Sequence, residues 1–119
     1  MIAVIFEVFP ADNRKDDYLE LAAPLKSELE GMEGFISVER FQSLKDPNKL
    51  LSLSFWRDEE VVAGWRFRDR HRAAQSAGRK GILRDYRLRV ASVIRDYDMS
   101  ERREQAPADS RAIHEGLGT

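Results

Sequence analysis

The sequence predicts an α+β domain of the ferredoxin-like type, in which the elements follow the order βαββαβ along the chain. One observation behind this prediction is that segments with the two-residue period of strands alternate with segments of helical apolar spacing. A second is that turn and cap signals separate these segments, as at Pro10, Gly31 and the run KDPN at 45–48. We therefore expect one antiparallel sheet with both helices on the same face.

The first third of the chain predicts a strand followed by a helix. Residues 2–9 are rich in β-branched and aromatic types. One face of this strand is wholly apolar and consists of Ile2, Val4, Phe6 and Val8. Asp12 or Asn13 is expected to cap the helix, whose apolar residues recur at helical spacing until Gly31 ends it in the left-handed conformation. This helix has one apolar stripe to bury against the sheet.

The remainder of the folded part predicts a hairpin, a second helix and a last strand. Strands are expected over residues 35–44 and 49–56, joined by a tight turn in which proline and asparagine favour chain reversal. Asp58 is placed to cap the second helix, because two glutamates follow it where the helix dipole favours negative charge. The alternating segment 86–97 predicts the last strand.

Length and composition limit the classes of protein that fit. The 119 residues are expected to form one domain over residues 1–99, followed by a polar tail over 100–119 that is flexible or contacts a partner subunit. A net charge of −1 argues against a nucleic-acid partner, and no apolar run approaches the ~20 residues of a membrane helix. The apolar start lacks a basic leader, which favours a cytoplasmic location. The absence of cysteine excludes disulfide and thiolate chemistry.

Both faces of the predicted sheet carry large apolar residues. On the third strand Leu51, Leu53 and Phe55 face one way, whereas Leu50 and Trp56 face the other. An antiparallel sheet with one solvated face should instead alternate apolar with polar residues. We therefore expect the face without helices to pack against a second copy of the chain, as a C2 homodimer.

Four segments of the sequence resemble one known family. They read GMEGFISVERFQS, DPNKLLSLSFWRDEEVVAGW, HRAAQ and VIRDY. Over residues 1 to about 98 the chain resembles the antibiotic biosynthesis monooxygenase family of dimeric α+β barrels. The resemblance implies a cavity between the sheet and the second helical region of each subunit. It also implies an oxidoreductase in which dioxygen attacks a small aromatic, phenolic or quinol-like compound without a cofactor or metal, because the substrate itself supplies the electrons.

Trp65 and His71 are the main candidates for a functional role in this cavity. Trp65 lies on the apolar side of the second helix, where the resemblance places a tryptophan beside the pocket whose ring can stack on a planar substrate. His71 is a candidate for proton transfer in catalysis, because histidine is the side chain whose ordinary pKa lies near neutral pH. The two residues are six positions apart, so they converge only if the helix breaks between them. Core packing of Trp65 and a structural role for His71 are the alternatives.

Further candidates for substrate contacts come from the strands and from one arginine. Trp56 ends the third strand, where core packing is the alternative to a role in the site. Ser54 shares the face of Trp56, and Tyr86 lies on the last strand, so both hydroxyls are candidates to hydrogen-bond a phenolate. Arg79 is a candidate for contact with an anionic substrate group at the cavity mouth. The sequence contains no metal-ligand spacing and no glycine-rich phosphate loop.

Haem binding or haem degradation is the alternative cofactor chemistry. The haem-degrading relatives are similar in having an asparagine on the first strand, this tryptophan, and a haem-ligating histidine ten residues beyond it. In this sequence Glu7 lies near the first of these places and Gln75 occupies the last. The expected function is a cofactor-independent monooxygenase, with a haem protein or a non-catalytic ligand-binding domain of the same fold as the alternatives.

Overall fold

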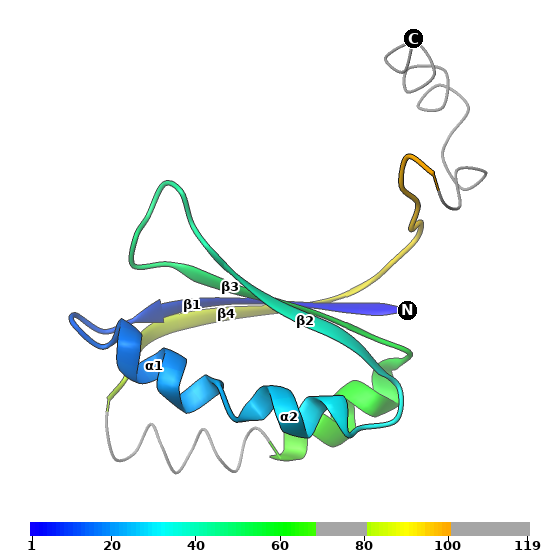
Figure 1. Cartoon of the computed structure of the whole chain (residues 1–119), viewed down its shortest axis with the longest axis horizontal. Helices are drawn as coiled ribbons and strands as arrows, with labels where there is room; N and C mark the ends of the chain where they lie inside the picture. Colours follow the sequence, from blue (N-terminus) through cyan, green and yellow to red (C-terminus); the bar gives the residue numbers. More distant parts are fainter. Residues whose placement is uncertain (69–80, 101–119) are drawn as a thin grey trace, which may run out of the picture.

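The structure is a computed structural model that describes residues 1–68 and 81–100. Its antiparallel sheet has the order β2-β3-β1-β4 and consists of β1 (Ile2–Pro10), β2 (Phe35–Gln42), β3 (Leu50–Trp56) and β4 (Leu83–Ser92). The described helices are α1 (Lys15–Ala22), α2 (Leu25–Glu30) and a helix over residues 59–68. All of them lie on one side of the sheet (Figure 1). This arrangement confirms the ferredoxin-like α+β fold.

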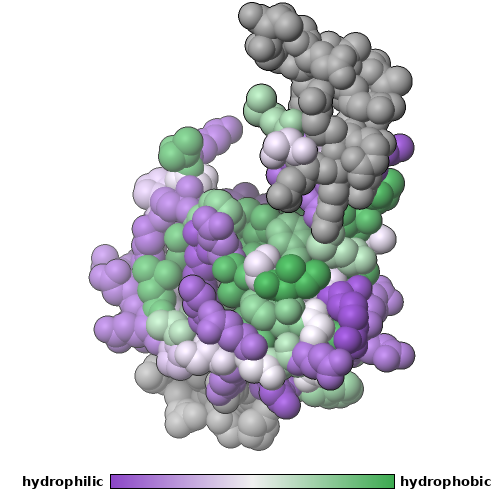
Figure 2. All heavy atoms as spheres, turned by 45° about the vertical axis from the view of Figure 1, so that its right-hand side comes forward, coloured by the Kyte–Doolittle hydropathy of each residue, from purple (hydrophilic) through white to green (hydrophobic). Residues whose placement is uncertain are grey.

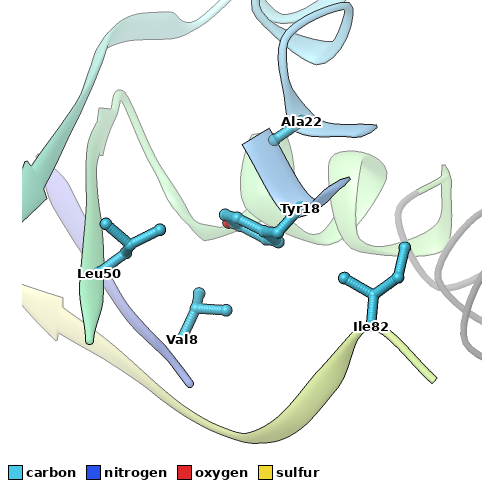
Figure 3. Packing of buried hydrophobic residues seen from close by; sticks show 5 residues of the cluster. All are labelled: Val8, Tyr18, Ala22, Leu50 and Ile82. Atoms are coloured by element: carbon cyan, nitrogen blue, oxygen red, sulfur yellow. The ribbon is translucent and has the colours of Figure 1, made fainter. Parts of the chain in front are cut away.

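The expected apolar face of the first strand is the face that the helices cover. Tyr18 of α1 lies over Val8 of β1, and Leu50 and Ile82 flank the tyrosine ring (Figure 3). Val8 has no exposed surface, and Ala22 at the end of α1 completes this cluster. The two-residue period of residues 2–9 therefore placed this face correctly, because alternate side chains of a strand point to the same side.

The single helix expected before Gly31 is in fact two helices, because Pro24 interrupts it. Proline has no backbone N–H, and its ring clashes with the carbonyl group four residues earlier, so a regular helix does not continue through it. α1 accordingly ends at Ala22, and α2 begins at Leu25.

The helical region ends at Gly31 as expected, but its predicted N-cap and the predicted left-handed backbone of Gly31 were wrong. The N-cap is Arg14, which makes no side-chain cap hydrogen bond, and Asn13 has a φ of 62°. Gly31 has a right-handed backbone with a φ of −82°. The left-handed glycine is Gly34, with a φ of 90°, immediately before β2. The glycine with a positive φ thus lies three residues beyond the one that the sequence pattern indicated.

The hairpin turn and the cap of the next helix match their predictions. The backbone N–H of Asn48 donates to Asp46 Oδ1 at 2.9 Å, and the N–H of Lys49 donates to the carbonyl of Asp46 at 3.1 Å. Asp58 Oδ1 accepts a hydrogen bond of 3.0 Å from the N–H of Val61, as expected of an N-cap. These short-range contacts depend on neighbouring residues alone, which is why local sequence rules found them.

The last strand is displaced from its expected position, since β4 spans Leu83–Ser92 rather than 86–97. One further backbone bond, from the N–H of Val93 to the carbonyl of Met1, extends its pairing with the start of the chain. In the described part of the chain, no helix has the length and apolar character needed to span a membrane. The predicted tail lies outside the described residues from position 101 onward.

Candidate functional site

The register of the sheet determines which strand residues point toward the helices. Residues paired across neighbouring antiparallel strands share a face. Phe6 packs against the cluster that contains Tyr18 of α1, so it points toward the helices. The residues paired in line with it, Ser52 on β3, Arg40 on β2 and Leu88 on β4, share this helix-side face.

The helix-side face is packed as two separate apolar clusters. The first consists of Val8, Tyr18, Ala22, Leu50 and Ile82, with Phe6 and Leu83 packed against it. The second consists of Leu29, Trp56, Val61 and Val62, with Ile2, Val4, Met32, Phe35, Val38 and Trp65 packed against it. Ser52, Arg40 and Leu88 belong to neither cluster. Within the part of the chain that the structure describes, Phe6 is therefore the only residue of this row that packs against an apolar cluster.

Trp56 belongs to the second cluster and is hydrogen-bonded to Ser54, a buried polar residue two positions earlier on β3. The indole N–H of Trp56 donates to Ser54 Oγ at 2.8 Å, and the side chains are 2% and 7% exposed, respectively. The Trp56 ring also meets Phe35 edge-on at a centroid distance of 5.3 Å. A buried tryptophan needs an acceptor for its indole N–H, and Ser54 already provides that acceptor within the protein.

Trp65 lies beside this buried pair, at the rim of the same cluster. Its ring centroid is 6.5 Å from that of Trp56, with an angle of 36° between the ring planes. Trp65 is half-buried, whereas Phe67 two residues later is 69% exposed. The structure therefore brings three of the predicted residues together, and of these only Trp65 has a free surface of any size.

Tyr86 is on the helix-side face but far from the two tryptophans. It pairs with Val8, whereas Trp56 pairs with Ile2, so their positions differ by six residues along β1. At about 3.3 Å per residue this is a separation of about 20 Å along the strand. Tyr86 contacts Phe6 instead, with ring centroids 5.7 Å apart.

Tyr86 belongs to an apolar row on β4 that the sequence analysis did not identify. Tyr86, Leu88 and Val90 alternate along this strand and are 60%, 49% and 41% exposed. We call these three residues the β4 row. They point to the side of the sheet on which the helices lie, where apolar side chains are normally covered, so the described helices leave an apolar surface open at this edge.

The predicted residues His71 and Arg79 lie outside the described residues. Among the residues that the structure does describe, no group of three or more His, Cys, Asp or Glu side chains could hold a metal ion. An open cleft of about 950 Å³ lies between α2 and the helix over 59–68, and residues that line it include Glu28, Glu33, Glu60 and Arg68. None of the predicted site residues that the structure describes lines this cleft.

Glu7 points to the face of the sheet without helices, because it alternates with Phe6 and Val8. Its carboxylate pairs with Lys49 Nζ at 3.3 Å and with Arg89 Nη1 at 3.4 Å. Hydrogen bonding to Lys49, and the positive charges of Lys49 and Arg89, lower the pKa of Glu7 against the opposing effect of burial. Glu7 and Trp65 thus lie on opposite sides of the sheet, so the structure does not bring these two side chains into one site.

Comparison with known proteins identifies relatives over most of the chain. The family model described as antibiotic biosynthesis monooxygenase matches residues 1–77. The chain is 43% identical over 111 residues to a protein of Pyricularia oryzae named jasmonate monooxygenase, which covers 93% of this chain. The chain spans about half, 52%, of that relative's length. It is also 30% identical over 93 residues to an uncharacterised protein of Bacillus subtilis, covering 78% of this chain and 79% of the relative.

Solved structures share the fold at low sequence identity. A protein from Deinococcus radiodurans superposes with a TM-score of 0.72 at 9% identity, covering 82% of this chain and 97% of the other. A protein from Nitrosomonas europaea superposes with a TM-score of 0.68 at 10% identity, covering 80% of this chain and 100% of the other. At these identities the likeness supports the fold alone.

Proposed function

Because the chain belongs to the antibiotic biosynthesis monooxygenase family, we propose that it oxidises a small apolar compound with a phenolic or quinol-like ring, using dioxygen and no bound cofactor. The observation that carries this proposal is the exposed β4 row. Apolar side chains left open beside an aromatic ring such as Phe6 offer a surface for a flat apolar substrate. Trp65 offers a second aromatic face in the same layer between sheet and helices.

The proposed reaction balances without an external reductant. A CH₂ group activated by a neighbouring ketone or phenol loses a proton, and the resulting carbanion passes one electron to O₂. Recombination forms a C–O bond, and loss of water from the hydroperoxide leaves a ketone, so that CH₂ and O₂ become C=O and H₂O. The substrate carbon gives up four electrons and O₂ accepts four. The part left to the protein is to orient the substrate and to exclude water.

The relative from Pyricularia oryzae extends the range of substrates to be tested. That protein is named for jasmonate, a compound with a non-aromatic ring and one carboxylate on a side chain. The substrate panel therefore contains dihydroxyanthrone, its carboxylated analogue and jasmonate, together with the methyl esters of both acids.

The test is oxygen uptake above the spontaneous rate, with product analysis under oxygen-18 gas. We expect at least one compound to gain one labelled oxygen atom per O₂ consumed. Placing a charge in the β4 row by Leu88→Asp should lower kcat/KM about tenfold or more, because an apolar ring would then lie against an unpaired carboxylate. Leu44→Asp is the matched control, since Leu44 is fully exposed in the hairpin loop. Absence of oxygen uptake with the whole panel, or an unchanged kcat/KM in Leu88→Asp, contradicts the proposal.

We also propose that a second copy of the chain covers the face of the sheet without helices. Ile5, Leu53 and Phe55 point to this face, since they alternate with residues of the helix side. No described helix lies over it (Figure 1). In the oblique view of Figure 2, apolar residues are seen in the middle of the molecule with charged residues around them. A sheet face that carries apolar residues such as Ile5, Leu53 and Phe55 is stabilised when it packs against another sheet.

The charges at the two edges of this face favour a second copy as the partner. Glu39 on β2 and Arg87 on β4 lie at opposite edges of the sheet. Within the described residues, neither side chain has an ion-pair partner. A two-fold axis parallel to the strands places the β2 edge of one copy against the β4 edge of the other. The same axis then brings Glu39 of each subunit toward Arg87 of the partner.

Analytical ultracentrifugation at micromolar concentration tests this assembly. Leu53→Asp should convert a dimer to a monomer, whereas Leu44→Asp should not. Glu39→Arg and Arg87→Glu should each weaken the dimer, and the double variant should recover part of the loss. A monomeric wild-type protein, or single charge reversals without effect, argues against this arrangement.

A further inference from the structure

One row of side chains across the helix-side face changes from apolar to cationic. From the β4 edge to the β2 edge the paired residues are Leu88, Phe6, Ser52 and Arg40. We call this the graded row. The rows on either side lack a charge, since they read Tyr86, Val8, Leu50, Gln42 and Val90, Val4, Ser54, Val38. The graded row therefore combines an apolar end with a single positive charge.

Arg40 has an incomplete set of hydrogen-bond partners. Its Nη2 donates to the carbonyl of Ala22, the last residue of α1, at 3.2 Å. A cation at this place is favourable, because the C-terminal end of a helix carries partial negative charge. Among the residues that the structure describes, its buried Nε has no acceptor, and no carboxylate lies within ion-pair distance of the guanidinium.

The contact with Ala22 does not account for the unpaired Nε. Buried donors without an acceptor are rare in native proteins, so each one calls for an explanation. A guanidinium group carries five N–H donors in a planar fork, which matches the two oxygens of a carboxylate. Ser52 is the neighbour of Arg40 in the graded row and adds a hydroxyl donor.

The other end of the graded row is apolar and open. Leu88 is 49% exposed and lies between Tyr86 and Val90 of the β4 row. Three interstrand spacings separate Leu88 from Arg40, a distance of about 14 Å. A small molecule with an apolar body and one acidic group matches the graded row. Its body would lie on Leu88 and Phe6, and its acidic group would lie at Arg40.

We infer that Arg40, assisted by Ser52, binds the carboxylate of an amphipathic acid whose apolar body lies on the β4 row. This inference rests on the proposed function, because it names the class of compound that the same site takes. A monocarboxylate agrees with the charge present, since the graded row contains one cation and no second positive group for a phosphate. Arg40 is in this view a specificity-determining residue that holds the substrate and takes no part in electron transfer.

Binding measured without oxygen tests the inference separately from turnover. The probes are dihydroxyanthrone carboxylate and jasmonate, each compared with its own methyl ester by anaerobic calorimetry. We expect the wild-type protein to bind at least one acid about tenfold or more tightly than its ester, because only the acid forms a charge-assisted pair. In Arg40→Met the preference should disappear while the affinity for the ester stays unchanged.

Two further variants separate a ligand contact from a structural role. Arg66→Met removes the same charge from an exposed position on the helix over 59–68 and should keep the wild-type preference. Arg40→Lys keeps the charge without the planar fork and should retain part of the preference for the acid. This variant also tests the inference if Arg40→Met does not fold. Equal loss of acid and ester affinity in Arg40→Met, or a wild-type protein that binds neither acid better than its ester, overturns the inference.

Oxygen uptake distinguishes failure of this inference from failure of the proposed function. A protein that prefers the acids but consumes no oxygen supports the role of Arg40 and contradicts the monooxygenase. A protein that oxidises the esters as well as the acids, without an acid preference in binding, supports the monooxygenase and contradicts the role of Arg40.

Discussion

Replacing Trp56 with alanine is expected to lower the free energy of unfolding by about 3–5 kcal/mol, the range typical of large aromatic residues removed from a core. Trp56 is 2% exposed and joins β3 to the helix over 59–68 through its contact with Trp65. The substitution removes the edge-on contact with Phe35 as well. It also leaves the buried Ser54 hydroxyl without its indole partner, which adds to the loss.

Chemical denaturation followed by circular dichroism measures this effect. Phe67→Ala is the matched control, since it removes a large aromatic ring that is 69% exposed, and it should change the free energy of unfolding by less than about 0.5 kcal/mol. Trp56→Phe keeps most of the apolar volume but loses the N–H, so it should fall between the two. A loss below about 1 kcal/mol for Trp56→Ala would show that this cluster is not essential to the fold.

The order of elements could be predicted from the sequence because it depends on local periodicity. Residues 2–9 alternate, and Asp58 precedes two glutamates, so neither feature needs distant contacts to be recognised. The break at Pro24 was also a local signal, and the apolar spacing on both sides of it obscured that signal. The need for glycine at position 34 could not be found in this way, since Val61, which an added Cβ would meet at 2.5 Å, is 27 residues away along the chain.

The candidate site was only partly predictable, because it depends on strand register. Trp56, Ser54 and Trp65 were expected near one another, and in the structure Trp56 contacts both Trp65 and Ser54. Tyr86 was expected in the same site, but the pairing of β4 with β1 places it about 20 Å away along the strand.

Arg40 was missed, because within the segment FISVERFQ it is an ordinary polar residue of an alternating strand. Only the pairing of Arg40 with Ser52 and the unpaired Nε distinguish it. The one signal in the sequence was its shared face with Val38, which placed a charge on the side that the helices cover.

Replacing Gly34 with alanine is expected to destabilise the protein by about 2–4 kcal/mol through two separate effects. At a φ of 90° the backbone of Gly34 is unfavourable for any residue with a Cβ, at a cost of about 1–2 kcal/mol. The added Cβ would also lie 2.5 Å from Val61 Cγ2, and overpacking of this kind adds about 1–3 kcal/mol. Neither group can move freely, because the Gly34 carbonyl accepts a hydrogen bond of 2.7 Å from the N–H of Arg57, and Val61 is buried.

The two effects can be separated by a double-mutant cycle with Val61→Ala. Removing the Val61 methyl groups relieves the overlap but leaves the backbone strain, so the double variant should be more stable than the sum of the single losses by about 1 kcal/mol or more. Gly64→Ala is the control, and it should raise the stability and not lower it. Gly64 lies in the helix over 59–68, and no atom lies within 4 Å of a Cβ added there. Alanine should stabilise the helix there by about 0.5–1 kcal/mol. Additive losses in the cycle would contradict the steric effect, and the left-handed backbone of Gly34 would then account for the whole destabilisation.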